Sequence, residues 1–169
     1  MILHAGLVAL RLAGFWRGAL ICGPPGAGKS DLALKALDAG FRLVADDRVV
    51  VWRSGAVLFG RAPDPLAGLV EGRGVGIIRE SPLAMAEIVL AVSCSVDEAI
   101  ERMPEPETAD IAGVTIAQLR LDPFEASAPA KLRRALQHLG HNEQQAYQAR
   151  SSGGGDRLGT WGHPLRPRR

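Results

Sequence analysis

The sequence predicts an α/β protein in which a phosphate-binding loop joins a mixed β-sheet with flanking helices. The first observation behind this prediction is a strand, a glycine-rich loop and a helix in succession over residues 18–40. The second is a hairpin pattern over residues 48–59, where two β-rich runs are joined by a few residues that include Gly55. Because a hairpin pairs its strands antiparallel, the sheet is expected to be mixed rather than purely parallel.

Residues 23–30 read Gly-Pro-Pro-Gly-Ala-Gly-Lys-Ser, which fits the phosphate-binding loop (P-loop) pattern G-x-x-x-x-G-K-[ST]. The apolar run 19–22 before the loop is typical of a buried strand, and apolar residues recur at helical spacing after it, as far as Gly40. The pattern arises by chance in roughly 1 in 100 chains of this length, and the correct flanks lower that figure further. The sequence therefore predicts a P-loop nucleotide-binding core.

The residue types in this loop suit ATP and Mg²⁺. Glycines allow the backbone N–H groups to point at phosphate oxygens, and the helix N-terminus adds partial positive charge at the same place. Lys29, expected to face solvent without nucleotide, would reach the β- and γ-phosphates, while the Ser30 hydroxyl would ligate Mg²⁺. The predicted nucleotide-binding residues are Gly23, Pro24, Pro25, Gly26, Ala27, Gly28, Lys29, Ser30 and Asp31.

The other elements are predicted from hydrophobic pattern. One or two strands near a sheet edge are expected over residues 3–12, and residues 13–18 are expected to form a turn. Further strands are predicted at 41–45, 86–92 and 111–121, a short helix or turn at 96–103, and an amphipathic helix at 130–139. Residues 1–140 are predicted to form the catalytic domain, and residues 141–169, which lack apolar periodicity, a disordered or partner-ordered tail.

Two adjacent acidic residues, Asp46 and Asp47, follow the apolar run 41–45, and Asp47 comes 17 residues after Ser30. Adjacent side chains on an extended segment point to opposite faces, so the two carboxylates are expected to have different tasks. One would hold Mg²⁺, and the other would accept a proton from the phosphate acceptor. The alternative is that one aspartate caps a turn while the other is solvated.

A glycine-rich segment over residues 69–78 suits a loop whose backbone approaches a ligand, because three glycines within five positions are unusual inside a strand. Within it, Glu71 is a candidate second metal ligand and Arg73 a candidate phosphate clamp. The alternative is a solvated surface loop.

Composition limits the classes of partner and compartment. The 169 residues suit one domain, and a net charge of +2 supports no nucleic-acid partner. No apolar run reaches the roughly 18 residues of a membrane-spanning helix, and the N-terminus lacks a secretory pattern, so no membrane partner is expected. Two cysteines without paired spacing favour a cytoplasmic protein with reduced thiols.

Three blocks give the chain a resemblance to the catalytic domain of HPr kinase/phosphorylase, in the short form of some proteobacteria. These blocks are GPPGAGKSDLALKALDAG, then FRLVADDRVVV, and then Glu71 to Ile77, which looks like the family signature E-x-R-G-x-G-I. The resemblance implies a fold like the nucleotide-binding core of phosphoenolpyruvate carboxykinase. It also implies ATP-dependent phosphorylation of a serine on the carrier protein HPr, in the control of carbon metabolism. Many members of the family also remove this phosphate by phosphorolysis.

The resemblance further implies roles for individual residues. Lys29 and Ser30 would bind phosphate and Mg²⁺, Asp47 would be the base that activates the serine hydroxyl, and Glu71 would be a metal ligand. His4 and Arg102 fall near the family's other active-site positions. A homo-oligomer, the hexamer of the family, is also implied, and the aromatic side chains Trp16, Trp52 and Phe59 are candidates for its interface.

Two other functions remain open on the sequence. The first is a small-molecule kinase with the same loop, although no long helical insertion is present to serve as its lid. The second is a nucleotide-responsive binding protein without catalysis, which would bind ATP and a partner but transfer no phosphate.

Overall fold

The computed structural model describes residues 1–95 and 100–138 of the chain. The predicted tail over 141–169 and part of the segment predicted over 96–103 lie outside the described residues. The proposed domain boundary at residue 140 therefore stays a prediction. Among the described residues, no helix is long and apolar enough to cross a membrane.

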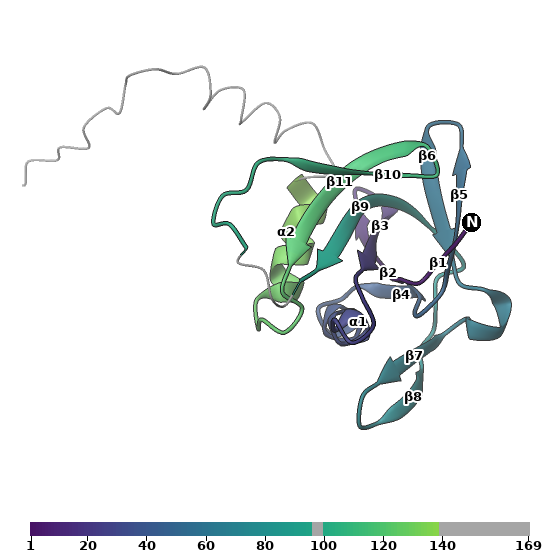
Figure 1. Ribbon diagram of the computed structural model, residues 1–169. Helices are drawn as coiled ribbons and strands as arrows, with labels where there is room; N and C mark the ends of the chain where they lie inside the picture. The colour runs from purple at the N-terminus through teal and green to yellow at the C-terminus, as the bar shows by residue number, and fades with distance from the viewer. Residues whose placement is uncertain (96–99, 139–169) are drawn as a thin grey trace, which may run out of the picture.

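A nine-stranded mixed sheet forms the body of the molecule (Figure 1). Seven strands run in the order β1-β5-β6-β9-β3-β2-β4, while β11 pairs with β9 and β10 with β11. The strands are β1 (Ile2–Leu3), β2 (Gly6–Leu12), β3 (Phe15–Cys22), β4 (Arg42–Ala45), β5 (Val49–Ser54), β6 (Val57–Arg61), β9 (Ala86–Cys94), β10 (Glu107–Ile111) and β11 (Val114–Leu121). The β3–β9 and β9–β11 pairs are parallel and the other pairs antiparallel, which confirms the predicted mixed sheet.

Two helices, α1 (Lys29–Asp38) and α2 (Ala128–His138), pack on one face of this sheet. Their apolar stripes meet β3 and β9 in one core cluster, where Leu32, Leu132 and Leu136 are fully buried. Burial of each such leucine contributes about 1.5–3 kcal/mol. A second apolar cluster fills the opposite face of the sheet. The predicted flanking helices are thus confirmed, although α2 begins two residues earlier than expected.

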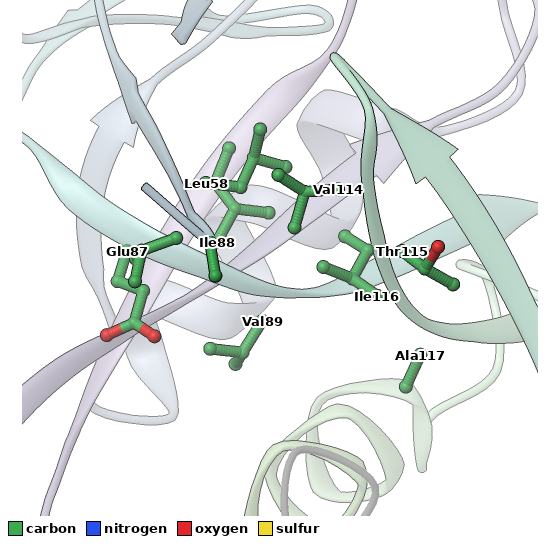
Figure 2. A pocket seen from close by; sticks show the side chains of 10 residues that line it. Leu58, Glu87, Ile88, Val89, Val114, Thr115, Ile116 and Ala117 are labelled. Carbon is green, nitrogen blue, oxygen red and sulfur yellow. The ribbon is translucent and has the colours of Figure 1, made fainter. Parts of the chain in front are cut away.

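The sheet divides along β9, whose first residues pair with β6 and whose last residues pair with β11. A pocket of about 210 Å³ opens at this fork, lined by apolar side chains such as Leu58, Ile88 and Val114 (Figure 2). Its lining includes none of the candidate site residues, because the fork lies toward the amino end of β9 and the P-loop follows the carboxyl end of β3.

Two local expectations were wrong, and a third was confirmed. Residues 13–18 were expected to be a turn, but only Ala13 and Gly14 turn the chain, and β3 begins at Phe15. The strand expected near a sheet edge, β2, lies next to β4, the last strand in the order. The segment 69–78 is a hairpin rather than a loop.

That hairpin is a separate two-stranded sheet, formed by β7 (Leu69–Gly72) and β8 (Gly76–Arg79) after the short 3₁₀ helix η1 (Asp64–Leu66). Its glycines occupy the turn and the strand ends, where positive backbone angles at Gly74 and Gly76 are needed. The hairpin packs beside α1 and brings Glu71 close to the end of β4.

Candidate active site

The candidate site lies at one edge of the main sheet, where several strands end together. The parallel strands β3, β9 and β11 have aligned carboxyl ends, since Cys22 pairs with Ser93 and Leu121 with Cys94. Strand β4 runs in the same direction as β3, because both are antiparallel to β2. The P-loop follows β3 and the two aspartates follow β4, so both segments leave the sheet at this edge.

Left-handed backbone at glycine shapes the P-loop. Gly28, with φ +83°, caps the N-terminus of α1, and its carbonyl accepts the Leu32 N–H at 2.9 Å. At Gly23, with φ +152°, an added side chain would lie 3.1 Å from the Cβ of Cys94. Backbone N–H groups at a loop of this kind, with a helix N-terminus behind them, are suited to bind anionic oxygens.

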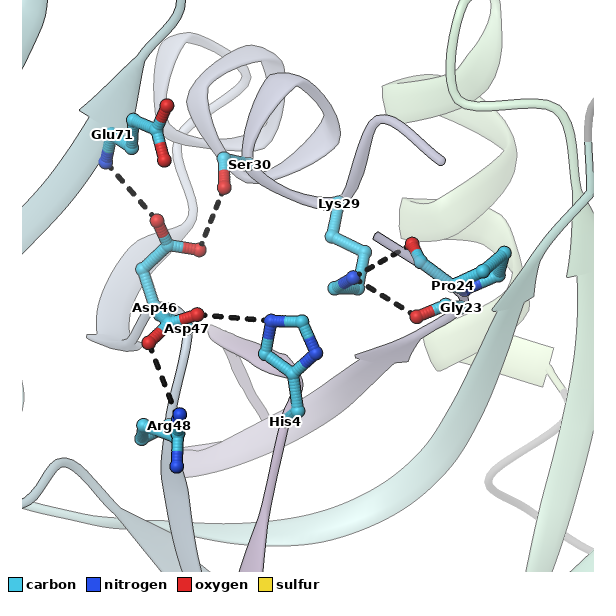
Figure 3. A network of polar contacts seen from close by, with 9 residues as sticks. All are labelled: His4, Gly23, Pro24, Lys29, Ser30, Asp46, Asp47, Arg48 and Glu71. Atoms are coloured by element: carbon cyan, nitrogen blue, oxygen red, sulfur yellow. Dashed lines mark hydrogen bonds and ion pairs between the residues drawn. The ribbon is translucent and has the colours of Figure 1, made fainter. Parts of the chain in front are cut away.

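Lys29 is folded into the loop rather than facing solvent as expected. Its side chain lies under the loop, the residue is only 8% exposed, and its Nζ donates hydrogen bonds to the carbonyls of Gly23 at 2.9 Å and Pro24 at 3.0 Å (Figure 3). The two carbonyls supply the partners that a buried ammonium requires. The arrangement places one positive charge at the centre of the loop.

Asp46 joins three elements of the site. It is 4% exposed, and its Oδ1 accepts a hydrogen bond from the Ser30 hydroxyl at 3.1 Å. Its Oδ2 accepts the backbone N–H of Glu71, also at 3.1 Å. One carboxylate therefore ties the end of β4 to the first turn of α1 and to β7 (Figure 3).

The residues around Asp46 fit a magnesium ion. A hydroxyl and a carboxylate are hard oxygen ligands, and Mg²⁺ is usually held by one or two such protein groups together with nucleotide phosphates and water. Residues 1–95 and 100–138 contain no group of three or more His, Cys, Asp or Glu side chains suited to a metal. A site that the nucleotide helps to complete is consistent with both observations.

Asp47 points away from Asp46, although the backbone is not extended as expected. Its φ of +63° is left-handed, a conformation that Asp and Asn tolerate better than most residues. The Ala5 N–H donates to its carbonyl at 3.2 Å and holds this turn against the chain before β2. The opposite directions predicted for the two aspartates thus come from a turn rather than from strand alternation.

The Asp47 carboxylate has one basic partner on each oxygen. His4 Nε2 lies 2.9 Å from Oδ1 and Arg48 Nε lies 3.3 Å from Oδ2 (Figure 3). The Asp47 side chain remains 58% exposed, so each oxygen keeps a lone pair that faces solvent. Exposed pairs of this kind are worth about 0–1 kcal/mol, so they orient the carboxylate more than they stabilise the fold.

The structure does not bring every candidate residue into this cluster. Glu71 contributes its backbone N–H, while its side chain is exposed, and Arg73 is exposed at the tip of the β7–β8 hairpin. Asp31 is half-buried in the first turn of α1. Arg102 is exposed, and no contact among the described residues joins it to the other candidates.

Cys22 and Cys94 border the P-loop as free thiols. Burial raises the pKa of Cys22, and it raises the pKa of Cys94 to about 11, although the positive charge of Lys29 partly opposes both shifts. Both thiols are therefore protonated at neutral pH and are poor nucleophiles.

Sequence reasoning missed Arg48 as a partner of Asp47. The available signal was its position directly after two aspartates in Asp-Asp-Arg, where a cation commonly faces a carboxylate. The segment 122–127, which follows β11 and contacts Gly28, carried no pattern that pointed to the P-loop.

The fold and the site define an α/β P-loop domain, with a loop lysine, a hydroxyl–carboxylate pair and a separate exposed carboxylate. A family model described as the HPr serine kinase C-terminal domain matches residues 2–132. The chain therefore belongs to this family.

Relatives and a solved structure agree with this assignment. The HPr kinase/phosphorylase of Limosilactobacillus reuteri is 51% identical over 67 residues, which cover 39% of this chain and 21% of that protein. The enzyme of the same name from Chromobacterium violaceum is 33% identical over 118 residues, covering 62% of this chain and 37% of that protein. The chain thus spans about a fifth to just over a third of the length of the curated relatives it matches.

The structure of the HPr(Ser) kinase/phosphatase from Coxiella burnetii resembles this one with a TM-score of 0.69 and 22% identity. The likeness covers 88% of this chain and 99% of that chain. At this level of identity the match shows that the two proteins share a fold.

Proposed function

We propose that the protein is an ATP-dependent serine kinase that phosphorylates an HPr-type carrier protein in the cytoplasm, where ATP is available. The observation that carries the proposal is the assembly at one sheet edge of the P-loop lysine, the Ser30–Asp46 pair and the exposed Asp47. Family membership over residues 2–132 supports the same activity, and the names of the relatives support HPr as the acceptor.

In this proposal the chain acts by positioning and by charge. The loop N–H groups hold the phosphates, and Lys29 Nζ exchanges the carbonyls of Gly23 and Pro24 for β- and γ-phosphate oxygens. Ser30 and Asp46 would hold Mg²⁺, with the exposed Glu71 carboxylate as a proposed further ligand, and the bound ion would neutralise charge on these oxygens. The burial of Asp46 keeps the Ser30 hydroxyl oriented before the nucleotide arrives.

Asp47 is proposed as the proton acceptor. The serine oxygen of HPr forms a bond to the γ-phosphorus, the bond from that phosphorus to the β–γ bridging oxygen breaks, and ADP leaves. The serine proton passes to a carboxylate oxygen of Asp47. His4 and Arg48 keep the carboxylate turned outward toward an incoming protein, where an exposed group can reach a serine on a surface.

The deciding experiment is transfer of radiolabelled γ-phosphate from ATP to HPr by the full chain, with a panel of nucleosides and sugars as competing acceptors. The proposal predicts label on the HPr serine and none on the small molecules. Label on a small molecule alone would identify a small-molecule kinase. ATP and HPr binding without transfer would identify a non-catalytic binding protein. The same assay run with phosphorylated HPr and inorganic phosphate tests for phosphorolysis.

We also propose that the protein is a homo-oligomer, with the hexamer of the family as the expected form. Trp52 and Phe59 stack at 5.8 Å on the β5–β6 hairpin and are only half-buried, which suits an interface, whereas Trp16 packs against the core. Light scattering should give a mass several times 17.9 kDa, and Trp52→Glu should lower it. A native mass of 17.9 kDa at micromolar concentration would contradict this prediction.

A further inference from the structure

The segment 122–127, between β11 and α2, lies directly against the P-loop. A side chain at Gly28 would come within 2.8 Å of Pro123 and 2.9 Å of the Phe124 ring. The contact is long-range in sequence and belongs to neither core cluster. It places an aromatic ring beside Gly28, the loop residue that directly precedes α1.

Phe124 is held in place and yet exposed. Lys35 Nζ donates to the Pro123 carbonyl at 2.9 Å and lies 5.9 Å from the centroid of the Phe124 ring. The Phe124 N–H donates to Asp122 Oδ1 at 2.8 Å. Despite these contacts the residue is 47% exposed. A single exposed apolar side chain is common on protein surfaces, so it is the place of this ring, fixed against the P-loop residue Gly28, that points to a ligand.

The sheet order puts this ring on the side of the P-loop opposite the aspartates. Strand β3 lies between β2 and β9; β4 lies beyond β2, and β11 beyond β9. The segments that carry Asp47 and Phe124 therefore leave the sheet from strands that lie two places from β3, in opposite directions. Figure 1 shows α1 between α2 on one side and the β7–β8 hairpin on the other.

We infer that Phe124 is the platform on which the nucleobase of the bound triphosphate stacks, an inference that rests on the proposed kinase function. A triphosphate held by the P-loop with its γ end at Asp46 and Asp47 must extend its base toward the other side of the loop. The ring there offers the face that every base can stack on. Lys35 of α1 holds this ring in place through its hydrogen bond to the Pro123 carbonyl and its contact with the ring.

Charge on this side of the loop suits an uncharged base better than a phosphate group. Asp122 and Glu125 are carboxylates of the same segment, and the hydrogen bond from Lys131, with a second from Ser127, lowers the pKa of Glu125. Glu125 is therefore ionised at neutral pH, partly balanced by Lys131, and disfavours a further anion beside it.

The test compares ATP with inorganic tripolyphosphate, which has the phosphates without the base. Calorimetry on the full chain with Mg²⁺ should show that Phe124→Ala weakens ATP binding about 10-fold, as expected for loss of one stacked base. Tripolyphosphate affinity should change less than about twofold, and Phe124→Trp should restore ATP affinity. Phe15→Ala is the matched control, because Phe15 is also exposed, at 64%, and also lies over a cation, Arg17, but at the far end of β3.

Each other outcome overturns the inference in a recognisable way. Unchanged ATP affinity in Phe124→Ala would contradict the inferred base contact, and so would equal affinity of the native chain for ATP and tripolyphosphate. Either result would leave the kinase proposal intact. Equal loss of both ligands in Phe124→Ala assigns the ring a structural role in the loop. A native chain that binds neither ligand contradicts the proposed function itself.

Discussion

Asp47→Asn is expected to lower phosphate transfer to HPr by about 10² to 10⁴, the usual cost of losing a general base. The substitution keeps the shape of the side chain, and asparagine tolerates the left-handed φ of +63° that this position requires. The exposed contacts with His4 and Arg48 contribute little to stability, so the melting temperature should change by only a degree or two. ATP affinity should be unchanged or slightly higher, because a negative charge near the triphosphate is removed. The measurements are transfer rate, calorimetric affinity and thermal melting.

Asp46→Asn is the matched comparison, since the two residues are neighbours with different contacts. Asp46 is buried and accepts hydrogen bonds on both oxygens, so an amide leaves one donor without an acceptor and costs about 1–3 kcal/mol of stability. Its transfer defect should lessen as Mg²⁺ is raised, whereas that of Asp47→Asn should not. Near-normal turnover in Asp47→Asn would remove the role proposed for it. Rescue of Asp47→Asn alone by Mg²⁺ would reverse the two assignments.

Lys29→Ala is expected to reduce turnover by about 10² to 10³ or more. It removes the positive charge at the centre of the loop, which would stabilise the negative charge on the phosphate oxygens in the transition state. ATP affinity should fall as well, since the same ammonium holds the bound phosphates. The core clusters do not include this side chain, so the fold should survive with a modest loss of stability from the two loop hydrogen bonds.

Arg134→Ala serves as the control for Lys29→Ala, because it removes an equal charge from an exposed side chain of α2 that hydrogen-bonds Gln137. Its transfer rate and melting temperature should stay close to those of the native protein. Full activity in Lys29→Ala, with the fold shown intact by circular dichroism, would mean that residues 23–30 do not bind the triphosphate.

Local sequence was sufficient for the parts of the site that are built locally. A P-loop is one continuous segment whose glycines, lysine and hydroxyl occupy fixed offsets, so residues 23–30 could be identified before any tertiary contact was known. The same holds for α1 and for the hairpin β5–β6, since hydrophobic period and turn residues are properties of neighbours along the chain.

The tertiary structure decided how these parts combine. Ser30, Asp46 and Glu71 meet because α1, β4 and β7 converge, across sequence separations of 16 and 25 residues that no local pattern encodes. The approach of His4 to Asp47 and the position of Phe124 beside Gly28 likewise depend on strand order. Strand order is set by which long-range pairings bury the most apolar surface and satisfy the most backbone groups, and these are properties of the whole chain rather than of any segment.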